Sequence, residues 1–292
     1  MVIVVSFLIL SCSSLAVVPS PETATALWQP FAEDAGSGLA YYAGRVTRPR
    51  LEFNALRVDL SHPGLRILTA GGGGDGSAEG RQFLSVKVST FVRGNNLTAG
   101  INALPFDPVS GKEGEPRTNI GIVVTDGVMV SPPHAQFDAL VFYADGSAAI
   151  TSQSAIQSAE DIDNAVGGFQ RILEGGELVP RVLDAQARQK AAPRHPRSAA
   201  GISSDGRYLY LLVIDGRRLG SVGSTEAETA LLLRALGASE GINFDGGGST
   251  ALALRYPGGK IRVVNTPIHG HIPGRERAVA GCLGIKKIME RE

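Results

Sequence analysis

The chain has 292 residues, and 28 Lys and Arg residues balance 28 Asp and Glu residues, so its formal net charge is zero. This balance argues against nucleic-acid binding driven by bulk charge. The length allows one large domain or two small ones with a sizeable core, and the 37 glycines predict many turns and short strands.

Residues 1–20 differ in composition from the rest of the chain. Val2 to Leu10 is an apolar run that is too short to cross a bilayer. It resembles the apolar part of a secretory signal, and Ile9-Leu10-Ser11-Cys12 resembles a lipoprotein cleavage box, although no Lys or Arg precedes the run. We therefore predict export to the cell envelope, lipid attachment at Cys12 and membrane contact through that anchor.

Behind this segment we expect a tether and lead-in over residues 21–50 and a single domain over residues 51–292. The alternation of Leu56 to Leu60 predicts a strand. Residues 71–80 predict a surface loop, because no Lys-Ser/Thr pair closes them as in a phosphate loop. Further short strands are predicted at 65–69, 121–125, 139–143 and 148–151.

The later part of the chain contains the strongest strand and the clearest helix. Tyr208 to Ile214 is apolar throughout, which predicts a strand buried on both faces. Thr225 is the expected N-cap of a helix, Glu228 its capping-box partner and Gly237 its end. The predicted fold class is therefore α+β, a single domain with many short strands in a mixed sheet and few helices.

Two aspartates flank the predicted helix. Asp215 follows the strand at 208–214, and Asp245 follows the apolar run Gly241 to Phe244. If these two strands are parallel, both acids lie at the same edge of a sheet, where open sheets bind ligands.

A glycine triplet, Gly246-Gly247-Gly248, comes directly after Asp245 and before Ser249-Thr250. Three consecutive glycines cost backbone entropy, so a fold keeps them where side chains would be in the way. Bare N–H groups beside a carboxylate suit a sugar or a phosphate. The same residues are also explained by a tight turn between strands, in which the Asp245 side chain accepts hydrogen bonds from the amides of the turn.

The apolar run from Val279 to Ile285 contains Cys282 and predicts a C-terminal strand with a buried thiol. A catalytic cysteine needs an electropositive, partly exposed setting, which this run does not offer. The sequence therefore argues against a thiol protease.

Four clusters hold polar groups that packing does not need. Taken alone, each has an ordinary interpretation as a turn cap, a solvated basic loop, a turn dipeptide or a surface charge run. The clusters are Asn102, His195-Pro196-Arg197-Ser198, Asp215-Gly216-Arg217 with Asp245 to Thr250, and Arg275-Glu276-Arg277.

Taken in order, these motifs resemble the phosphodiester glycosidase family over residues 99–285. Two positions depart from the family pattern: Leu104-Pro105-Phe106 follows Asn102, and Ser198 replaces the usual threonine. The resemblance is carried by Gly100-Ile101-Asn102-Ala103, His195 to Gly201, Asp215-Gly216-Arg217, Leu236-Gly237-Ala238, Asn243 to Thr250, Asn265-Thr266-Pro267 and Glu276 to Val279.

The resemblance implies hydrolysis of a sugar that is joined through its anomeric carbon to a phosphodiester. Such chemistry needs a carboxylate near an oxocarbenium-like transition state, and the candidates are Asp245, Asp215 and Glu276. A phosphodiester is a good leaving group, so cationic side chains replace the usual acid. The expected substrate-binding residues are Asn102, His195, Arg197, Arg217, Gly246, Gly247, Gly248, Ser249, Thr250 and Arg275.

Two other functions fit the same residues. A non-catalytic envelope protein that binds phosphorylated glycans would use the same site without chemistry. A metal-dependent phosphodiesterase would cut P–O instead of C–O, but no His, Asp and Glu residues have metal-site spacing. We therefore predict a phosphorylated glycan or sugar phosphodiester as the partner, with no metal, no cofactor and no nucleic acid.

Overall fold

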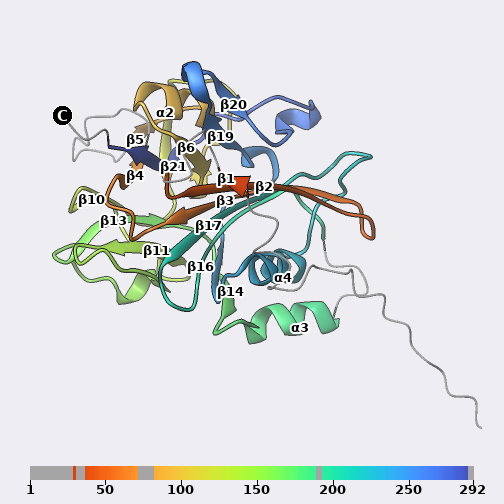
Figure 1. The fold of residues 1–292 in the computed structure, drawn as a ribbon, viewed down its shortest axis with the longest axis horizontal. Helices are drawn as coiled ribbons and strands as arrows, with labels where there is room; N and C mark the ends of the chain where they lie inside the picture. Colours follow the sequence, from red (N-terminus) through yellow and green to blue (C-terminus); the bar gives the residue numbers. More distant parts are fainter. Residues whose placement is uncertain (1–28, 31–36, 72–81, 189–192, 289–292) are drawn as a thin grey trace, which may run out of the picture.

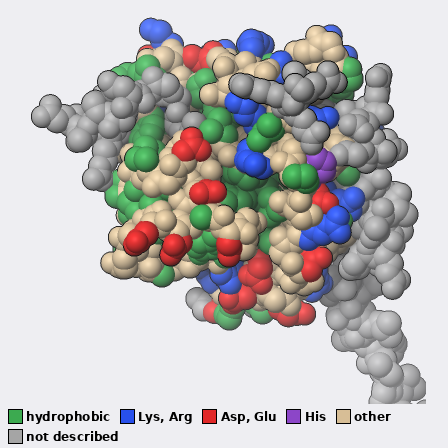
Figure 2. All heavy atoms as spheres, turned by 60° about the vertical axis from the view of Figure 1, so that its left-hand side comes forward, with side chains coloured by type: hydrophobic (Ala, Val, Ile, Leu, Met, Phe, Trp, Pro, Cys, Tyr) green, Lys and Arg blue, Asp and Glu red, His purple; other side chains and the backbone are tan. Residues whose placement is uncertain are grey.

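The computed structural model describes residues 29–30, 37–71, 82–188 and 193–288 (Figure 1). The predicted signal segment, Cys12 and nearly all of the loop at 71–80 lie outside these residues. Within the described residues, no helix has the length and apolarity needed to cross a membrane. Figure 2 shows described side chains of both charges on one face, with most of the acidic groups in its lower half.

An eight-stranded sheet forms the centre of the molecule. Residues that we placed in the lead-in contribute two of its strands, since β1 pairs with β2, and β2 pairs with β3 over eight positions. In spatial order the strands are β1 (Gln29–Pro30), β2 (Leu39–Val46), β3 (Leu51–Asp59), β17 (Tyr208–Ile214), β16 (Arg197–Ile202), β18 (Glu240–Asn243), β14 (Arg171–Glu174) and β15 (Glu177–Leu178).

Two five-stranded sheets and one three-stranded sheet complete the β structure. One has the order β10 (Val128–Ser131), β9 (Val123–Thr125), β13 (Ile162–Gly167), β11 (Asp138–Tyr143) and β12 (Ala148–Ser152). The second has the order β20 (Ile261–Val263), β19 (Leu252–Arg255), β6 (Ala99–Asn102), β21 (Gly281–Lys287) and β4 (Leu65–Gly71). The third has the order β5 (Gln82–Leu84), β8 (Pro116–Asn119) and β7 (Phe106–Asp107).

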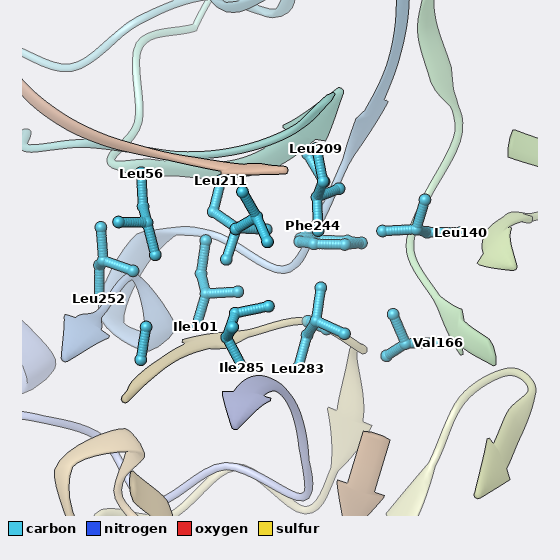
Figure 3. Packing of buried hydrophobic residues seen from close by; sticks show 14 of the residues in the cluster. Leu56, Ile101, Leu140, Val166, Leu209, Leu211, Phe244, Leu252, Leu283 and Ile285 are labelled. Carbon is cyan, nitrogen blue, oxygen red and sulfur yellow. The ribbon is translucent and has the colours of Figure 1, made fainter. Parts of the chain in front are cut away.

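The α+β class is confirmed, with the strands in several antiparallel sheets instead of one mixed sheet. The largest core cluster lies where one face of the eight-stranded sheet meets the two five-stranded sheets. Figure 3 shows Phe244 in this cluster, between Leu209 of β17 and Leu283 of β21 and beside Leu140 of β11. Phe244 is fully buried, so it anchors the chain one residue before Asp245.

The opposite face of the eight-stranded sheet packs against α4 (Glu226–Leu236). The predicted capping box is present, because Thr225 Oγ1 accepts from Glu228 N and the Glu228 carboxylate accepts from Thr225 N. Gly237 ends the helix in the left-handed region, also as predicted. Strand β17 is therefore buried on both faces.

The described residues contain two further α-helices that were not predicted from the sequence. The seven-residue α2 (Val88–Gly94) packs on the outer face of the sheet that contains β21. The second, α3 (Pro180–Arg188), lies beside α4 (Figure 1). Cys282 is buried in β21 with a free thiol, as expected, and burial raises the pKa of that thiol.

The topology brings the two aspartates to one sheet edge. Both β17 and β18 pair antiparallel with β16, so they run parallel to each other without being neighbours. Asp215 and Asp245 follow the ends of these strands, and Arg197 begins β16 between them. The expectation that both acids lie at the same edge is confirmed.

Candidate active site

A cavity of about 270 Å³ opens at this edge, beyond the ends of β16 and β18. Three arginines and one histidine line it, and they come from three separate segments of the chain. The wall consists of Phe169, His195, Pro196, Arg197, Arg217, Gly246, Gly247, Gly248 and Arg277.

The glycine triplet forms one wall because side chains have no room there. A Cβ on Gly246 would lie 2.6 Å from the Pro196 carbonyl oxygen, and a Cβ on Gly248 would lie 2.5 Å from the Arg277 guanidinium. Gly247 has a φ of +62°, which favours glycine. The triplet thus keeps two arginine side chains, Arg217 and Arg277, close to bare backbone.

Asp245 is partly exposed and directly precedes this wall. Burial raises the pKa of its carboxyl group to about 6, against the opposing effects of the Ser249 hydroxyl, Arg277 and the Gly246 N–H. A carboxyl group with such a pKa changes its charge close to neutral pH, as a general acid or base must.

Asn102 holds the backbone of Asp245 in place. Its Nδ2 donates to the Asp245 carbonyl oxygen at 2.6 Å, while its Oδ1 accepts from Ser198 Oγ at 2.7 Å and from Ala251 N at 3.1 Å. Asn102 and Ser198 are both buried, and neither lines the cavity. This sequence-predicted residue therefore joins β6, β16 and the segment after the glycine triplet.

Arg197, Arg217 and His195 were predicted from the sequence, and the structure brings them together in the cavity wall. Arg197 is held by a hydrogen bond from Nε to the Ser224 carbonyl oxygen at 3.2 Å. Arg217 Nη2 lies 3.5 Å from His195 Nδ1. Burial, and then the charges of Arg197 and Arg217, lower the pKa of His195 and so favour its neutral form.

Arg277 lines the cavity, whereas Arg275, the arginine chosen from the sequence, is exposed outside its wall. Arg277 Nη1 donates to Ser249 Oγ at 3.1 Å, and its Nε donates to His269 Nδ1 at 3.0 Å. The His269 ring sits in η4 (His269–His271), against Gly111, where a Cβ would lie 2.5 Å from the ring. Ser249 therefore contacts Arg277 as well as the Asp245 carboxyl group.

Asp215 lies at the same sheet edge but has different surroundings. It is 3% exposed, and its carboxylate accepts from Thr266 N at 2.9 Å, Asn265 Nδ2 at 3.3 Å and Arg218 Nη2 at 2.8 Å. Burial raises its pKa, and these three partners act in the opposite direction. Asp215 lines a second cavity and is not in the wall of the first.

Glu276 and Thr250, two other sequence candidates, also lie outside the wall of the arginine-lined cavity. Glu276 accepts from Ser89 N at 3.1 Å and from Ser89 Oγ at 2.5 Å, so it serves the first turn of α2. Thr250 is buried, and its carbonyl oxygen accepts from Asn265 Nδ2 at 3.1 Å. Among the residues that the structure describes, no group of three or more His, Cys, Asp or Glu side chains could hold a metal ion.

Sequence reasoning did not select Arg277, His269 or Phe169. Arg277 stands in the motif Glu276 to Val279, directly before a buried apolar run, and this position was the available signal. Phe169 has no motif of its own and enters the wall because its N–H bonds the Asn243 carbonyl oxygen at 2.8 Å.

The protein has a mostly antiparallel α+β fold, and its cavity contains three arginines beside Asp245, an acid of raised pKa. The positive charge of this cavity suits an anionic substrate. The model of the phosphodiester glycosidase family matches residues 95–286. This match spans more than half of the chain, which therefore belongs to the phosphodiester glycosidase family.

A curated protein is similar to part of this chain. The SPbeta prophage-derived uncharacterized protein YomE of Bacillus subtilis is 30% identical over 174 residues, which are 57% of this chain and 25% of that protein. The chain thus spans a quarter of the length of this curated relative.

Solved structures share the fold at low sequence identity. The catalytic domain of zebrafish N-acetylglucosamine-1-phosphodiester alpha-N-acetylglucosaminidase, auto-inhibited by its pro-peptide, has a TM-score of 0.66 at 19% identity, over 89% of this chain and 87% of that one. A putative exported protein from Burkholderia pseudomallei has a TM-score of 0.55 at 18% identity, over 81% and 74%. A hypothetical protein from Synechocystis has a TM-score of 0.59 at 15% identity, over 85% and 62%.

Proposed function

We propose that this chain is an exported hydrolase that cleaves the glycosidic bond of a sugar 1-phosphodiester. The observation that carries the proposal is a cavity wall that contains Arg197, Arg217 and Arg277 and begins directly after Asp245, whose pKa is about 6 and which Arg277 influences. Family membership supports the reaction type. The name of the zebrafish neighbour supports an N-acetylglucosamine 1-phosphodiester as the first substrate to test.

In this proposal Asp245 is the general base. Above pH 6 its carboxylate takes a proton from a water molecule whose oxygen attacks the anomeric carbon. The bond from that carbon to the phosphate oxygen breaks, and its electron pair leaves with the phosphate as a phosphomonoester. Attack by water in a single displacement inverts the anomeric configuration, so retention of configuration would instead make Asp245 a nucleophile.

The three arginines stabilise the departing phosphate. Negative charge grows on the leaving oxygen as the bond breaks, and fixed guanidinium groups stabilise that charge without reorganisation. A protonated acid is therefore not required on this side of the bond. Phe169 supplies an apolar wall on which a sugar ring can pack.

We assign supporting roles to the other two acids. Asp215 accepts hydrogen bonds from Thr266 and Asn265 and thereby holds its own segment, which also contains Arg217, in place. Glu276 bonds the first turn of α2 and thereby holds that helix against the segment that contains Arg277. Asn102 is a positioning residue for Asp245, because it bonds the backbone and not the carboxylate.

The test is a product assay on the purified chain from about Pro19 with N-acetylglucosamine 1-phosphodiesters, with and without a chelator. We expect free sugar and phosphomonoester in both conditions. Loss of turnover with chelator and its recovery with a divalent cation would indicate metal-dependent chemistry. Tight binding of several diesters without any turnover would indicate a glycan-binding protein.

Export is a separate part of the proposal and rests on the apolar run and on Cys12. The likeness in fold to a putative exported protein gives it weak support. Fractionation of cells that express the full chain should place it in the envelope, and Cys12→Ser should release it from the membrane fraction. Recovery of the unaltered chain in the cytoplasm would contradict export.

A further inference from the structure

Arg277, one of the three arginines in the cavity wall, is held at two places on its guanidinium group. Its Nε donates to His269 Nδ1 at 3.0 Å, and its Nη1 donates to Ser249 Oγ at 3.1 Å. The Ser249 hydroxyl in turn bonds the Asp245 carboxyl group. A guanidinium group has five N–H bonds. Within the described parts of the chain only these two make a hydrogen bond, so three are left for a ligand in the cavity.

The two acceptors come from short helical segments that pack against each other. Ser249 ends η2 (Gly247–Ser249), and His269 begins η4. The guanidinium group lies against bare backbone, because a Cβ on Gly248 would lie 2.5 Å from Arg277 Nη2 and 3.2 Å from its Nε. A rotation of the Arg277 side chain away from the cavity would therefore break both hydrogen bonds.

His269 has contacts of its own that fix its ring. Its N–H donates to the Arg275 carbonyl oxygen at 3.0 Å. The ring packs closely on Gly111, where a Cβ would lie 2.5 Å from Nε2 and 2.8 Å from Cδ2. Neither contact involves the Arg277 side chain, so the ring can orient the guanidinium group.

The hydrogen bond also defines the protonation state of His269. A ring nitrogen that accepts a hydrogen bond carries no proton, so Nδ1 is bare and the neutral ring has its proton on Nε2. Burial, and then the charges of Arg277 and Arg275, lower the pKa of His269 and favour this neutral form. His269 therefore orients Arg277 without compensating its positive charge.

The neighbouring Arg197 is held differently, since its Nη1 lies 3.8 Å from the carboxylate oxygen Oε1 of Glu226. The carboxylate that acts on the charge of Arg277 is that of Asp245. In the proposed reaction Asp245 takes a proton from water and becomes neutral. The charge of Arg277 is then available to the leaving phosphate, on which negative charge grows as the bond breaks.

We propose that His269 is a positioning residue for Arg277. As a neutral acceptor it directs the remaining N–H bonds of the guanidinium group to the cavity and leaves the positive charge to the departing phosphate. The inference rests on the proposed function for the use of Arg277, whereas the hydrogen bond and the tautomer of His269 are independent of any reaction.

The kinetic test uses three variants and an N-acetylglucosamine 1-phosphodiester. His269→Asn keeps an acceptor, because Asn Oδ1 and His Nδ1 are both bonded to Cγ, and His269→Leu removes it. His271→Leu, at an exposed position of η4, is the matched control. We expect His269→Leu to lower kcat/KM about tenfold, mostly through kcat, and the other two variants to stay within about threefold.

A second comparison asks whether His269 acts through Arg277. In an Arg277→Gln background, His269→Leu should cost less than about twofold, because the group that it positions is gone. An equal loss in both backgrounds, an equal loss for His269→Asn and His269→Leu, or no loss for His269→Leu would each overturn the inference.

Nitrogen-15 NMR of the histidine rings at pH 7.5 gives a readout that needs no turnover. The His269 signals are identified by their loss in His269→Asn. We expect Nδ1 without a proton, Nε2 with one, and a shift of the Nδ1 signal in Arg277→Gln, whereas a protonated Nδ1 would overturn the inference.

Hydrolysis of the diester by the unaltered chain separates this inference from the proposed function. If no hydrolysis occurs, the proposed reaction is wrong, and equilibrium binding of the same diester then decides the role of His269. His269→Leu should weaken that binding about fivefold and His269→Asn by less than about twofold. Equal affinities of the unaltered chain and His269→Leu would overturn the inference.

Discussion

Asp215 and Asp245 have matching positions in the topology and opposite surroundings. Each follows the end of one of two parallel strands, at the same sheet edge, with Arg197 of β16 between them. Asp215 is buried against Thr266, Asn265 and Arg218. Asp245 stands beside the glycine triplet, is partly exposed, and has a pKa of about 6.

This difference in surroundings shows that the end of a strand places an acid at the sheet edge, while the residues that follow it determine whether its carboxylate is neutralised or lies beside an open cavity. After Asp215, Arg218 bonds back to its carboxylate and neutralises it. After Asp245, three glycines provide no side chain, so Arg277 approaches from another segment and the cavity stays open.

The largest effect should come from Asp245→Asn, with a loss of about 10³-fold or more in kcat. The same change should raise the free energy of unfolding at pH 7.5 by up to about 3 kcal/mol. Burial raises the folded-state pKa above the unfolded value, so ionisation at high pH costs stability and protonation at low pH removes that cost. The gain should therefore vanish at pH 4, and activity assays and thermal melts at both pH values check it.

Asp161→Asn, in an exposed turn, is the control for Asp245→Asn. It should change neither activity nor the pH dependence of the melting temperature. Turnover near the unaltered level in Asp245→Asn would remove Asp245 from the mechanism.

Arg277→Gln should lower kcat/KM by about 10²-fold, because one of the guanidinium groups that face the departing phosphate is lost. Arg275→Gln, two residues earlier, is the matched control. Because the Arg275 side chain is exposed, this change should alter kcat/KM by less than about twofold. Steady-state kinetics on one diester checks both. If Arg275→Gln had the larger effect, the assignment of the arginine-lined cavity would be wrong.

Asp215→Ala should act on stability more than on chemistry. It leaves the Thr266 N–H and the Asn265 amide without their acceptor, and each buried unpaired group is costly, so we expect a loss of roughly 2–4 kcal/mol. Denaturant unfolding measures this loss. With an N-acetylglucosamine 1-phosphodiester, kcat per folded molecule should stay within about tenfold of the unaltered chain. A loss as large as that of Asp245→Asn would erase the distinction between the two acids.

The pH profile of kcat/KM should show an acidic limb with an apparent pKa of about 6. Protonation of Asp245 removes the base, so the rate should fall about tenfold for each pH unit below that value. A limb near pH 4 would instead indicate a carboxylate in an ordinary, solvated environment.

The smallest effect should come from Glu276→Gln. The carboxylate accepts from Ser89 in the first turn of α2, and its charge favours that helix end, so its loss should cost about 1 kcal/mol. Thermal melts should show this loss, and kcat should stay unchanged. A large drop in kcat with normal stability would return Glu276 to the list of catalytic candidates.

Local signals in the sequence were sufficient for several elements and for the order of the site motifs. The Thr225 and Glu228 capping box, the doubly buried strand Tyr208 to Ile214 and the buried Cys282 all depend on neighbouring residues, and all three are confirmed. The short α2 was missed because its seven residues have no N-cap side chain, and Glu276, far away in sequence, bonds Ser89 in its first turn.

The sequence by itself determined that Asp215 and Asp245 end two strands and that the glycine triplet needs empty space, because these properties follow from strand periodicity and the missing Cβ. Only the tertiary structure decided which acid is neutralised, which arginine of 275 and 277 enters the cavity, and that Asn102 holds Asp245. Several of these contacts join residues far apart in the sequence, by 50 positions for Asn265 with Asp215 and by 143 for Asn102 with Asp245, whereas Arg218 bonds Asp215 from three positions away. The pKa of Asp245 and the wall of the arginine-lined cavity depend on how these segments pack together. The local sequence pattern contains no information about that packing.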